Sequence, residues 1–165
     1  MKWVGLKFAK ALRIPALILG LTSTAYAQDI PLMQENWLRY KVNGTDIPGL
    51  KHSISIRGPD GFWAFTEWRL RATELCFVTV TVNYYIPEIR DRSAVPANVL
   101  VKWDRMIENL ITHEKKHGQN GFEAAKEVMA NKCENAVEIT KRWAEKDRLL
   151  DQKTRHGVLD GVFLE

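Results

Sequence analysis

The chain has 165 residues, of which 45% are hydrophobic and 27% charged, so its size and composition are those of one globular domain. Its 24 Lys and Arg residues outnumber its 20 Asp and Glu residues, a surplus that would favour a nucleic-acid or anionic-membrane partner. All of the surplus lies in residues 1–27, which contain no acid and four basic residues: Lys2, Lys7, Lys10 and Arg13. Because residues 28–165 are charge-balanced, we expect no nucleic-acid partner.

Residues 1–27 have the layout of a secretory signal peptide. A basic start is followed by the apolar run Ile14–Leu21, and Ala25 and Ala27 have the A-x-A spacing that precedes cleavage. The alternative, a membrane anchor, is disfavoured because the run is shorter than the roughly 20 residues of a spanning helix. The sequence thus predicts one domain, residues 28–165, that is periplasmic or secreted and has no membrane anchor after cleavage.

The only two cysteines, Cys76 and Cys133, both lie in the predicted exported part. In an oxidising compartment an isolated pair is most simply a disulfide. The alternative is two free, buried thiols. No CxxC pair occurs, so a cysteine-based metal site is not expected.

The first half of the predicted domain is typical of β-structure. Alternating apolar residues and turn residues such as Gly58-Pro59-Asp60-Gly61 predict about four strands. Pro87 is expected to end the last of them. Short connections favour an antiparallel meander. The predicted strands are Trp37–Val42, Lys51–Arg57, Phe62–Arg71 and Leu75–Ile86.

The second half is typical of α-helix, which makes the expected fold class α+β. After Pro96, apolar residues recur at steps of three and four from Leu100 to Val128, forming one helical face. A second helix is expected over Glu134–Leu150; whether Asn131–Cys133 separates the two is left open. The tail, Asp151–Glu165, is expected to fold back onto the domain.

The pentapeptide His113-Glu114-Lys115-Lys116-His117 is an HExxH motif within the long predicted helix. Histidines at i and i+4 share a helical face and can bind one Zn²⁺ ion. Glu114 lies close enough to accept a proton from a metal-bound water as general base. The alternative is a buried polar layer in which the histidines are hydrogen-bonded and Glu114 pairs with Arg57 or Arg69.

A catalytic zinc usually has a third protein ligand and one open position. Residues at spacings used by other HExxH enzymes are Glu123, Glu134 and Glu138. His156 is a further candidate, because imidazole is a common zinc ligand and a tail that folds back would deliver it. His52, the remaining histidine, is expected to be a solvent-facing strand residue.

Acidic residues near the end of the chain are candidates for orienting the zinc ligands. Zinc-bound imidazoles usually donate their second N–H to a carboxylate or a carbonyl. Asp151 or Asp147 would suit this role. The alternative for Asp151 is a solvated loop acid.

Several features together resemble a bacterial family of secreted zinc-dependent proteases, the domain of unknown function 922. The resemblance covers about residues 40–157 and depends on the HExxH motif together with the closing pattern Asp151…Thr154-x-His156-Gly157. It is strengthened by the following residues: Gly58-Pro59, Trp68, Cys76, Pro87, Trp103 and Cys133.

The resemblance implies His113, His117 and His156 as ligands of one zinc ion and Glu114 as the base. This chain has Leu150 where the family usually has an aromatic residue, often Tyr. If that tyrosine binds an oxyanion in relatives, the role is vacant here or belongs to another residue; the candidates are Tyr84, Tyr85 and Arg155.

The sequence therefore predicts an exported zinc peptidase that acts on a peptide or protein substrate through a metal-activated water. The alternative is a non-catalytic, zinc-stabilised envelope binding module. An open coordination position beside a cleft would favour the peptidase, and a closed four-ligand site would favour the binding module.

Overall fold

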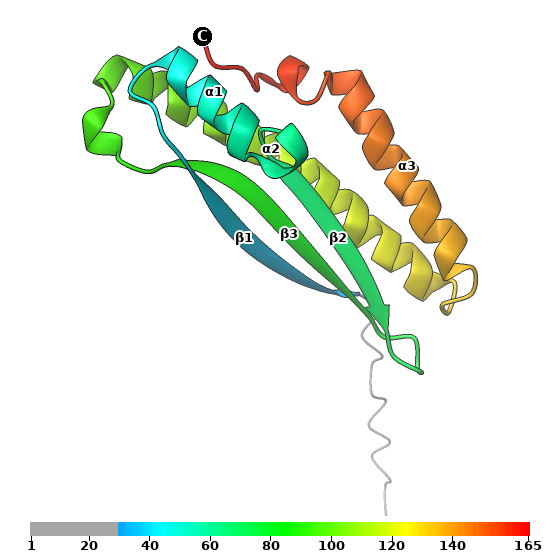
Figure 1. Ribbon diagram of the computed structural model, residues 1–165. Coiled ribbons are helices and arrows are strands. Elements are labelled where there is room, and N and C mark those ends of the chain that lie inside the picture. The colour runs from blue at the N-terminus through cyan, green and yellow to red at the C-terminus, as the bar shows by residue number, and fades with distance from the viewer. Residues whose placement is uncertain (1–29) are drawn as a thin grey trace, which may run out of the picture.

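Three strands and three α-helices make up residues 30–165, the part of the chain that this computed structural model describes (Figure 1). The α+β class is confirmed, while the predicted signal peptide, residues 1–27, lies outside the described residues. Within residues 30–165, no helix has the length and hydropathy needed to cross a membrane. The elements are β1 (Leu32–Val42), α1 (Ile47–Arg57), β2 (Phe65–Ala72), β3 (Val78–Ile89), α2 (Ala97–Ala130) and α3 (Ala136–Thr154).

The sheet has the strand order β1-β3-β2, with β3 in the centre. β2 pairs with β3 in the antiparallel sense, but β1 pairs with β3 in the parallel sense, from Leu32 opposite Thr79 to Val42 opposite Ile89. The predicted four-stranded antiparallel meander is therefore wrong. The chain between β1 and β3 contains α1 and β2, which is long enough for the crossover that parallel neighbours require.

The predicted strand Lys51–Arg57 is instead the greater part of α1. Its start is fixed locally, because the Asp46 carboxylate accepts a hydrogen bond from the Gly49 N–H at 2.8 Å and Pro48 occupies the first turn. Ile54 is fully buried, whereas Ile56 is exposed, so their alternation in the sequence did not reflect a strand face.

Strand β3 continues past Pro87 to Ile89, where the sequence predicted that it would end. β2 pairs with β3 only as far as Tyr85, so Pro87 lies beyond the antiparallel ladder. Its only strand neighbour among the described residues is Tyr40 of β1. The missing N–H of proline is tolerated at such a position.

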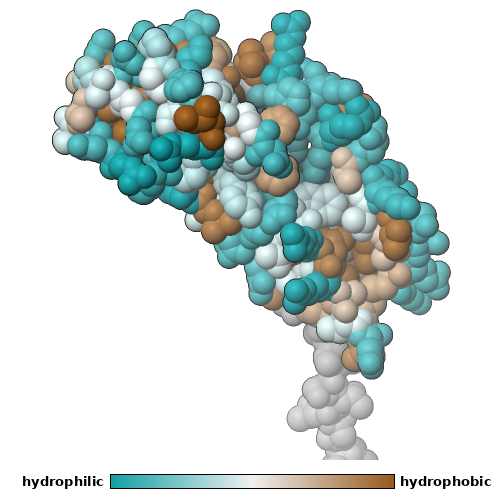
Figure 2. Space-filling model, viewed as in Figure 1, coloured by the Kyte–Doolittle hydropathy of each residue, from teal (hydrophilic) through white to brown (hydrophobic). Residues whose placement is uncertain are grey.

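The core lies between α2 and the inner face of the sheet. From Val78 to Ile86, the residues on this face of β3 are all buried: Val78, Val80, Val82, Tyr84 and Ile86. The facing stripe of α2 contains Trp103, Met106, Leu110, Ala125 and Val128. Outside, hydrophilic residues predominate on the face shown in Figure 2, and hydrophobic residues form separate patches.

Helices α2 and α3 form a hairpin whose turn is tied to the sheet. α2 ends at Ala130, because Lys132 and Cys133 adopt positive φ angles of 50° and 63°. Cys133 forms a disulfide with Cys76, in the turn before β3, as predicted. This bond is consistent with an exported protein.

The tail after α3 folds back onto the domain, as predicted. Val162 and Leu164 are buried, and the Val162 N–H donates to the Gly157 carbonyl at 3.0 Å. In Figure 1 the tail crosses from the end of α3 toward the upper end of α2. This return brings the tail against the middle of the long helix.

Candidate metal site

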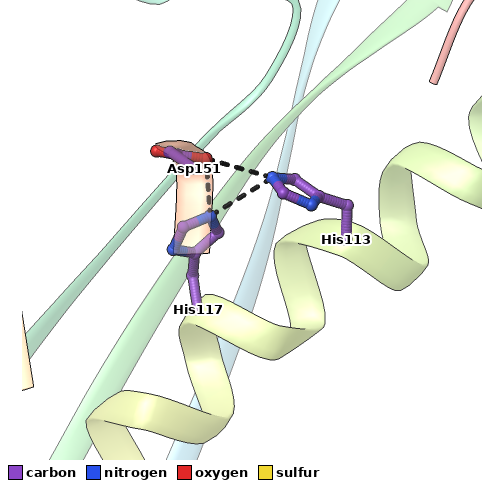
Figure 3. Close-up of side chains that lie close together, drawn as sticks. All are labelled: His113, His117 and Asp151. Atoms are coloured by element: carbon purple, nitrogen blue, oxygen red, sulfur yellow. Dashed lines mark hydrogen bonds and ion pairs between the residues drawn. The ribbon is translucent and has the colours of Figure 1, made fainter. Parts of the chain in front are cut away.

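The two histidines of the HExxH motif lie one turn apart on the buried face of α2 and point toward α3. His113 Nε2 and His117 Nε2 are 3.3 Å apart, and each lies 3.2 Å from Oδ1 of Asp151 (Figure 3). For bonds of about 2.0–2.1 Å, two ligand atoms of a tetrahedral zinc ion lie roughly 3.3–3.4 Å apart. The three atoms therefore have the spacing of a metal-binding set, which makes them a candidate metal site.

The other nitrogen of each imidazole faces a carboxylate. His113 Nδ1 lies 2.9 Å from Oδ2 of Asp160, and His117 Nδ1 lies 3.2 Å from Oδ1 of Asp147. A carboxylate at Nδ1 favours the tautomer with the proton on Nδ1 and leaves the Nε2 lone pair for a metal.

Both of these carboxylates are themselves held in place. Oδ2 of Asp147 accepts from the Trp68 indole N–H, and Oδ1 accepts from the Asn120 amide, each at 2.6 Å. Asp160 forms an ion pair with Lys116 at 2.7 Å. Asp147 was a predicted candidate for this role, whereas Asp160 was missed because only the folded tail brings it to His113.

Glu114 is only 5% exposed and lies against strand β2. Its Oε2 accepts a hydrogen bond from the Thr66 hydroxyl at 2.6 Å. Neither predicted alternative partner, Arg57 or Arg69, forms an ion pair with Glu114. The pKa of Glu114 is raised, because the effect of burial is larger than the lowering effect of the Thr66 hydrogen bond and the nearby histidines.

Two glycines let α2 approach the sheet this closely. A Cβ atom on Gly118 would lie 2.1 Å from the Tyr84 hydroxyl, and one on Gly121 would lie 2.5 Å from Cγ of Trp68. Both distances are far shorter than a van der Waals contact. Because glycine has no side chain at these two positions, Glu114 can reach Thr66 and Trp68 can reach Asp147.

The electrostatics of the histidines depend on the carboxylates around them. Burial lowers the pKa of His117, but hydrogen bonds to Asp147 and Asp151 outweigh burial and raise it to about 10. The pKa of His113 is raised in the same way by Asp151 and Asp160, against the effect of burial. Burial alone would raise the pKa of Asp151. The two histidines have the larger, opposite effect, so the pKa lies well below its usual range.

The closing motif builds the turn that follows α3. The Thr154 hydroxyl accepts from the Gly157 N–H at 3.2 Å, and Gly157 has a φ angle of +83°. A Cβ atom on Gly157 would lie 3.2 Å from Cγ of His113. The small residue at this position therefore lets the tail pack directly against a candidate ligand.

His156 lies at the edge of the site rather than among the three close donor atoms. Its side chain is 64% exposed, its Nδ1 is 3.9 Å from Oδ2 of Asp151, and its ring lies beside Phe62 with centroids 5.9 Å apart. Asp151 thus occupies the position expected for His156, and a ligand role for His156 stays a prediction.

The remaining sequence candidates do not reach the donor atoms. Glu123 pairs with Lys126, and Glu134 and Glu138 are exposed on the α2–α3 turn and the start of α3. Tyr84 and Tyr85 donate to Glu35 and Glu67. His52 is exposed, as expected, but lies on α1 rather than on a strand. Of the residues proposed for an oxyanion, only Arg155 lines the pocket beside the candidate metal site.

The candidate metal site opens into a pocket of about 630 Å³. Its walls come from α1, from the segment before β2 and the start of β2, from α2, from the end of α3 and from the tail. Glu114, both histidines and Asp151 line the same pocket. A buried carboxylate beside a metal-binding set, open to a cavity of this size, can activate water against a bound small molecule or peptide segment.

The fold and the site define an α+β protein with a two-histidine, one-carboxylate candidate metal centre on a long helix. Residues 37–157 match the model of the family described as bacterial protein of unknown function, DUF922. The match covers more than half of the chain, so the chain belongs to this family. Neither a curated protein nor a solved structure matches the chain.

Proposed function

We propose that this chain is a zinc-dependent peptidase of the bacterial envelope or exterior. The observation that carries the proposal is the tetrahedral spacing of three donor atoms, from His113, His117 and Asp151, in an open pocket that also contains Glu114. Two histidines and a carboxylate form the protein ligand set of several zinc peptidases. The HExxH spacing favours zinc over other metals.

When bound, zinc acidifies a water molecule and polarises a substrate carbonyl. The chain's own residues supply proton transfer and orientation. Thr66 donates to Oε2 of Glu114, and Oε1 has no side-chain hydrogen bond among residues 30–165. In this proposal Oε1 is the oxygen that would receive the proton of the attacking water. Glu114 then passes this proton to the leaving amine. Asp147 and Asp160 hold the imidazoles so that both Nε2 atoms face Oδ1 of Asp151, where zinc would bind.

The position of strand β2 is a second argument for a peptide substrate. It lies at one edge of the sheet, and its outer edge has no strand partner among residues 30–165. Thr66 of β2 contacts Glu114, so a peptide that added to this edge would pass beside the base.

Substitution of Glu114 by Gln tests the proposal. We expect the variant to keep its zinc, because Glu114 is not one of the three close donors, and to lose peptide hydrolysis, because the amide is not a base. Zinc is measured by mass spectrometry, and hydrolysis is measured on denatured casein with and without chelator. Full hydrolysis by the variant would exclude Glu114 as the base.

The second candidate function is an envelope binding module with structural zinc. It requires a closed site, and Glu134 and Glu138, the proposed fourth ligands, do not reach the donor atoms. The absence of chelator-sensitive hydrolysis in zinc-loaded wild-type protein would favour this candidate over the peptidase.

A further inference from the structure

The pocket beside the candidate metal site has an apolar wall that is partly open to solvent. Four large hydrophobic residues of its lining have side chains that are about 40–50% exposed: Phe62, Phe65, Val158 and Phe163. Exposed apolar residues that gather around a cavity mark a surface for an apolar ligand group. The wall therefore favours a ligand with a large apolar side chain.

The same pocket has basic residues without acidic partners. Lys51 on α1 and Arg155 after α3 both line it, are exposed, and have no ion-pair partner among residues 30–165. Arg148 lines it as well but pairs with Glu145. Two unpaired cations beside an apolar wall attract an anionic group on the ligand.

Three of the four acids that line the pocket are engaged by other residues. Glu114 is bonded to Thr66, Asp147 to Trp68 and Asn120, and Asp151 to the two histidines. The fourth, Glu165, is exposed at the end of the tail. Three of the four acids are therefore not available to neutralise Lys51 and Arg155.

We infer that the pocket selects peptides in which a large apolar side chain adjoins a carboxylate, with the carboxylate held by Lys51 and Arg155. Arginine pairs with a carboxylate through two parallel hydrogen bonds, which adds geometric selectivity to charge. This inference rests on the proposed function, because it names the substrate class of that site. The carboxylate can belong to an acidic side chain or to a peptide C-terminus.

Binding of short dansylated peptides to zinc-loaded Glu114→Gln protein tests the inference without turnover. The probes are dansyl-Ala-Phe-Ala-amide (neutral), dansyl-Ala-Phe-Asp-amide (side-chain carboxylate) and dansyl-Ala-Phe with a free C-terminus. We expect at least one acidic probe to bind about tenfold more tightly than the neutral one, as one charge-assisted contact provides. The acidic probe that binds more tightly identifies the source of the carboxylate.

Charge reversal identifies the residues responsible. Arg155→Glu should abolish the preference, Arg155→Lys should retain part of it, and Lys51→Glu should reduce it. Arg105→Glu is the matched control, because Arg105 is exposed on α2 and does not line the pocket. Equal affinity for neutral and acidic probes, or a preference that survives reversal of both residues, would overturn the inference.

Hydrolysis of the same probes by the wild-type protein separates this inference from the peptidase proposal. Charge-selective binding without cleavage would contradict the peptidase and leave the ligand class standing. Cleavage without any preference for the acidic probes would support the peptidase and overturn the ligand class.

Discussion

At the scale of single residues, Asp151 is the position where the structure changes the interpretation of the sequence most. The sequence suggested that Asp151 orients a zinc ligand and that His156 is the third ligand. The structure places Oδ1 of Asp151 at 3.2 Å from both Nε2 atoms and leaves His156 largely exposed. The sequence motif identifies the candidate residues. Which of them lies next to the two Nε2 atoms depends on how α3 and the turn after it pack against α2.

Zinc analysis of two variants distinguishes the two candidate ligands. Asp151→Ala should lose zinc affinity by a large factor, because it removes one of three close donor atoms, whereas His156→Ala should change it little. Zinc affinity is measured by competition with a chromogenic chelator. Loss of zinc in His156→Ala, with zinc retained in Asp151→Ala, would restore His156 as the third ligand.

The raised pKa of His117 predicts how zinc-free protein responds to pH. His117 has a pKa of about 10 in the folded state and about 6.5 in an unfolded chain. A raised folded-state pKa stabilises the fold fully below about pH 6.5, and this stabilisation is lost as the pH rises toward 10. The pKa of His113 shifts in the same direction.

Urea unfolding of chelator-treated protein between pH 6 and 10 measures this effect. We expect the free energy of unfolding to fall across the interval. Zinc-loaded protein is the control and should show a smaller fall, because a metal-bound nitrogen carries no proton to lose. Equal pH dependence of the zinc-free and zinc-loaded forms would contradict the attribution of the fall to His113 and His117.

At the scale of elements, the close approach of α2 to the sheet depends on positions that hold no side chain. Glycine within a helix lowers its stability, so Gly→Ala at an unrestricted helical site stabilises a protein by about 1 kcal/mol. At Gly121 the added Cβ atom would lie 2.5 Å from Cγ of Trp68. The packing cost and the helix propensity therefore have opposite signs.

We expect Gly121→Ala to destabilise the fold by about 1–3 kcal/mol, the usual cost of overpacking. Displacement of Trp68 should also weaken its hydrogen bond to Asp147 and reduce zinc affinity. Thermal unfolding and zinc titration measure the two effects, with Lys102→Ala, an exposed α2 position, as control. A stabilised Gly121→Ala variant would contradict this prediction, because it would show that Trp68 and the sheet move enough to accommodate the added methyl group.

The elements differ in how well the sequence predicted them, for a physical reason. α2 was predicted because its buried stripe continues over many turns, and the inner face of β3 because it alternates regularly. α1 was missed because Ile54 and Ile56 imitate strand alternation over a short range. The better local indicator was the cap, Asp46 followed by Pro48.

The parallel pairing of β1 with β3 has no such local indicator, because strand order depends on contacts between distant segments. The same holds for Asp160, which is 47 residues from His113 in the sequence. The histidines and Glu114 could be predicted because their spacing within one helix fixes their geometry.

At the scale of the whole molecule, the disulfide joins the turn before β3 to the α2–α3 turn. It closes a long loop, since Cys76 and Cys133 are 57 positions apart. We expect Cys76→Ser/Cys133→Ser protein to be less stable by about 4 kcal/mol, the chain-entropy effect for a loop of this size. Urea unfolding of this variant beside reduced and oxidised wild-type protein measures the effect. Equal stability of the oxidised wild type and the variant would contradict a stabilising role.

The candidate metal site draws its carboxylates from the end of the chain, with Asp151 and Asp160 located 38 and 47 residues after His113. A ribosome therefore releases the two histidines well before the acids that complete and orient the site. For the proposed zinc enzyme, this order makes tight metal capture a late event that waits for the tail to fold. A cell that exports the chain unfolded would deliver it without metal, and the receiving compartment would then determine which metal it acquires.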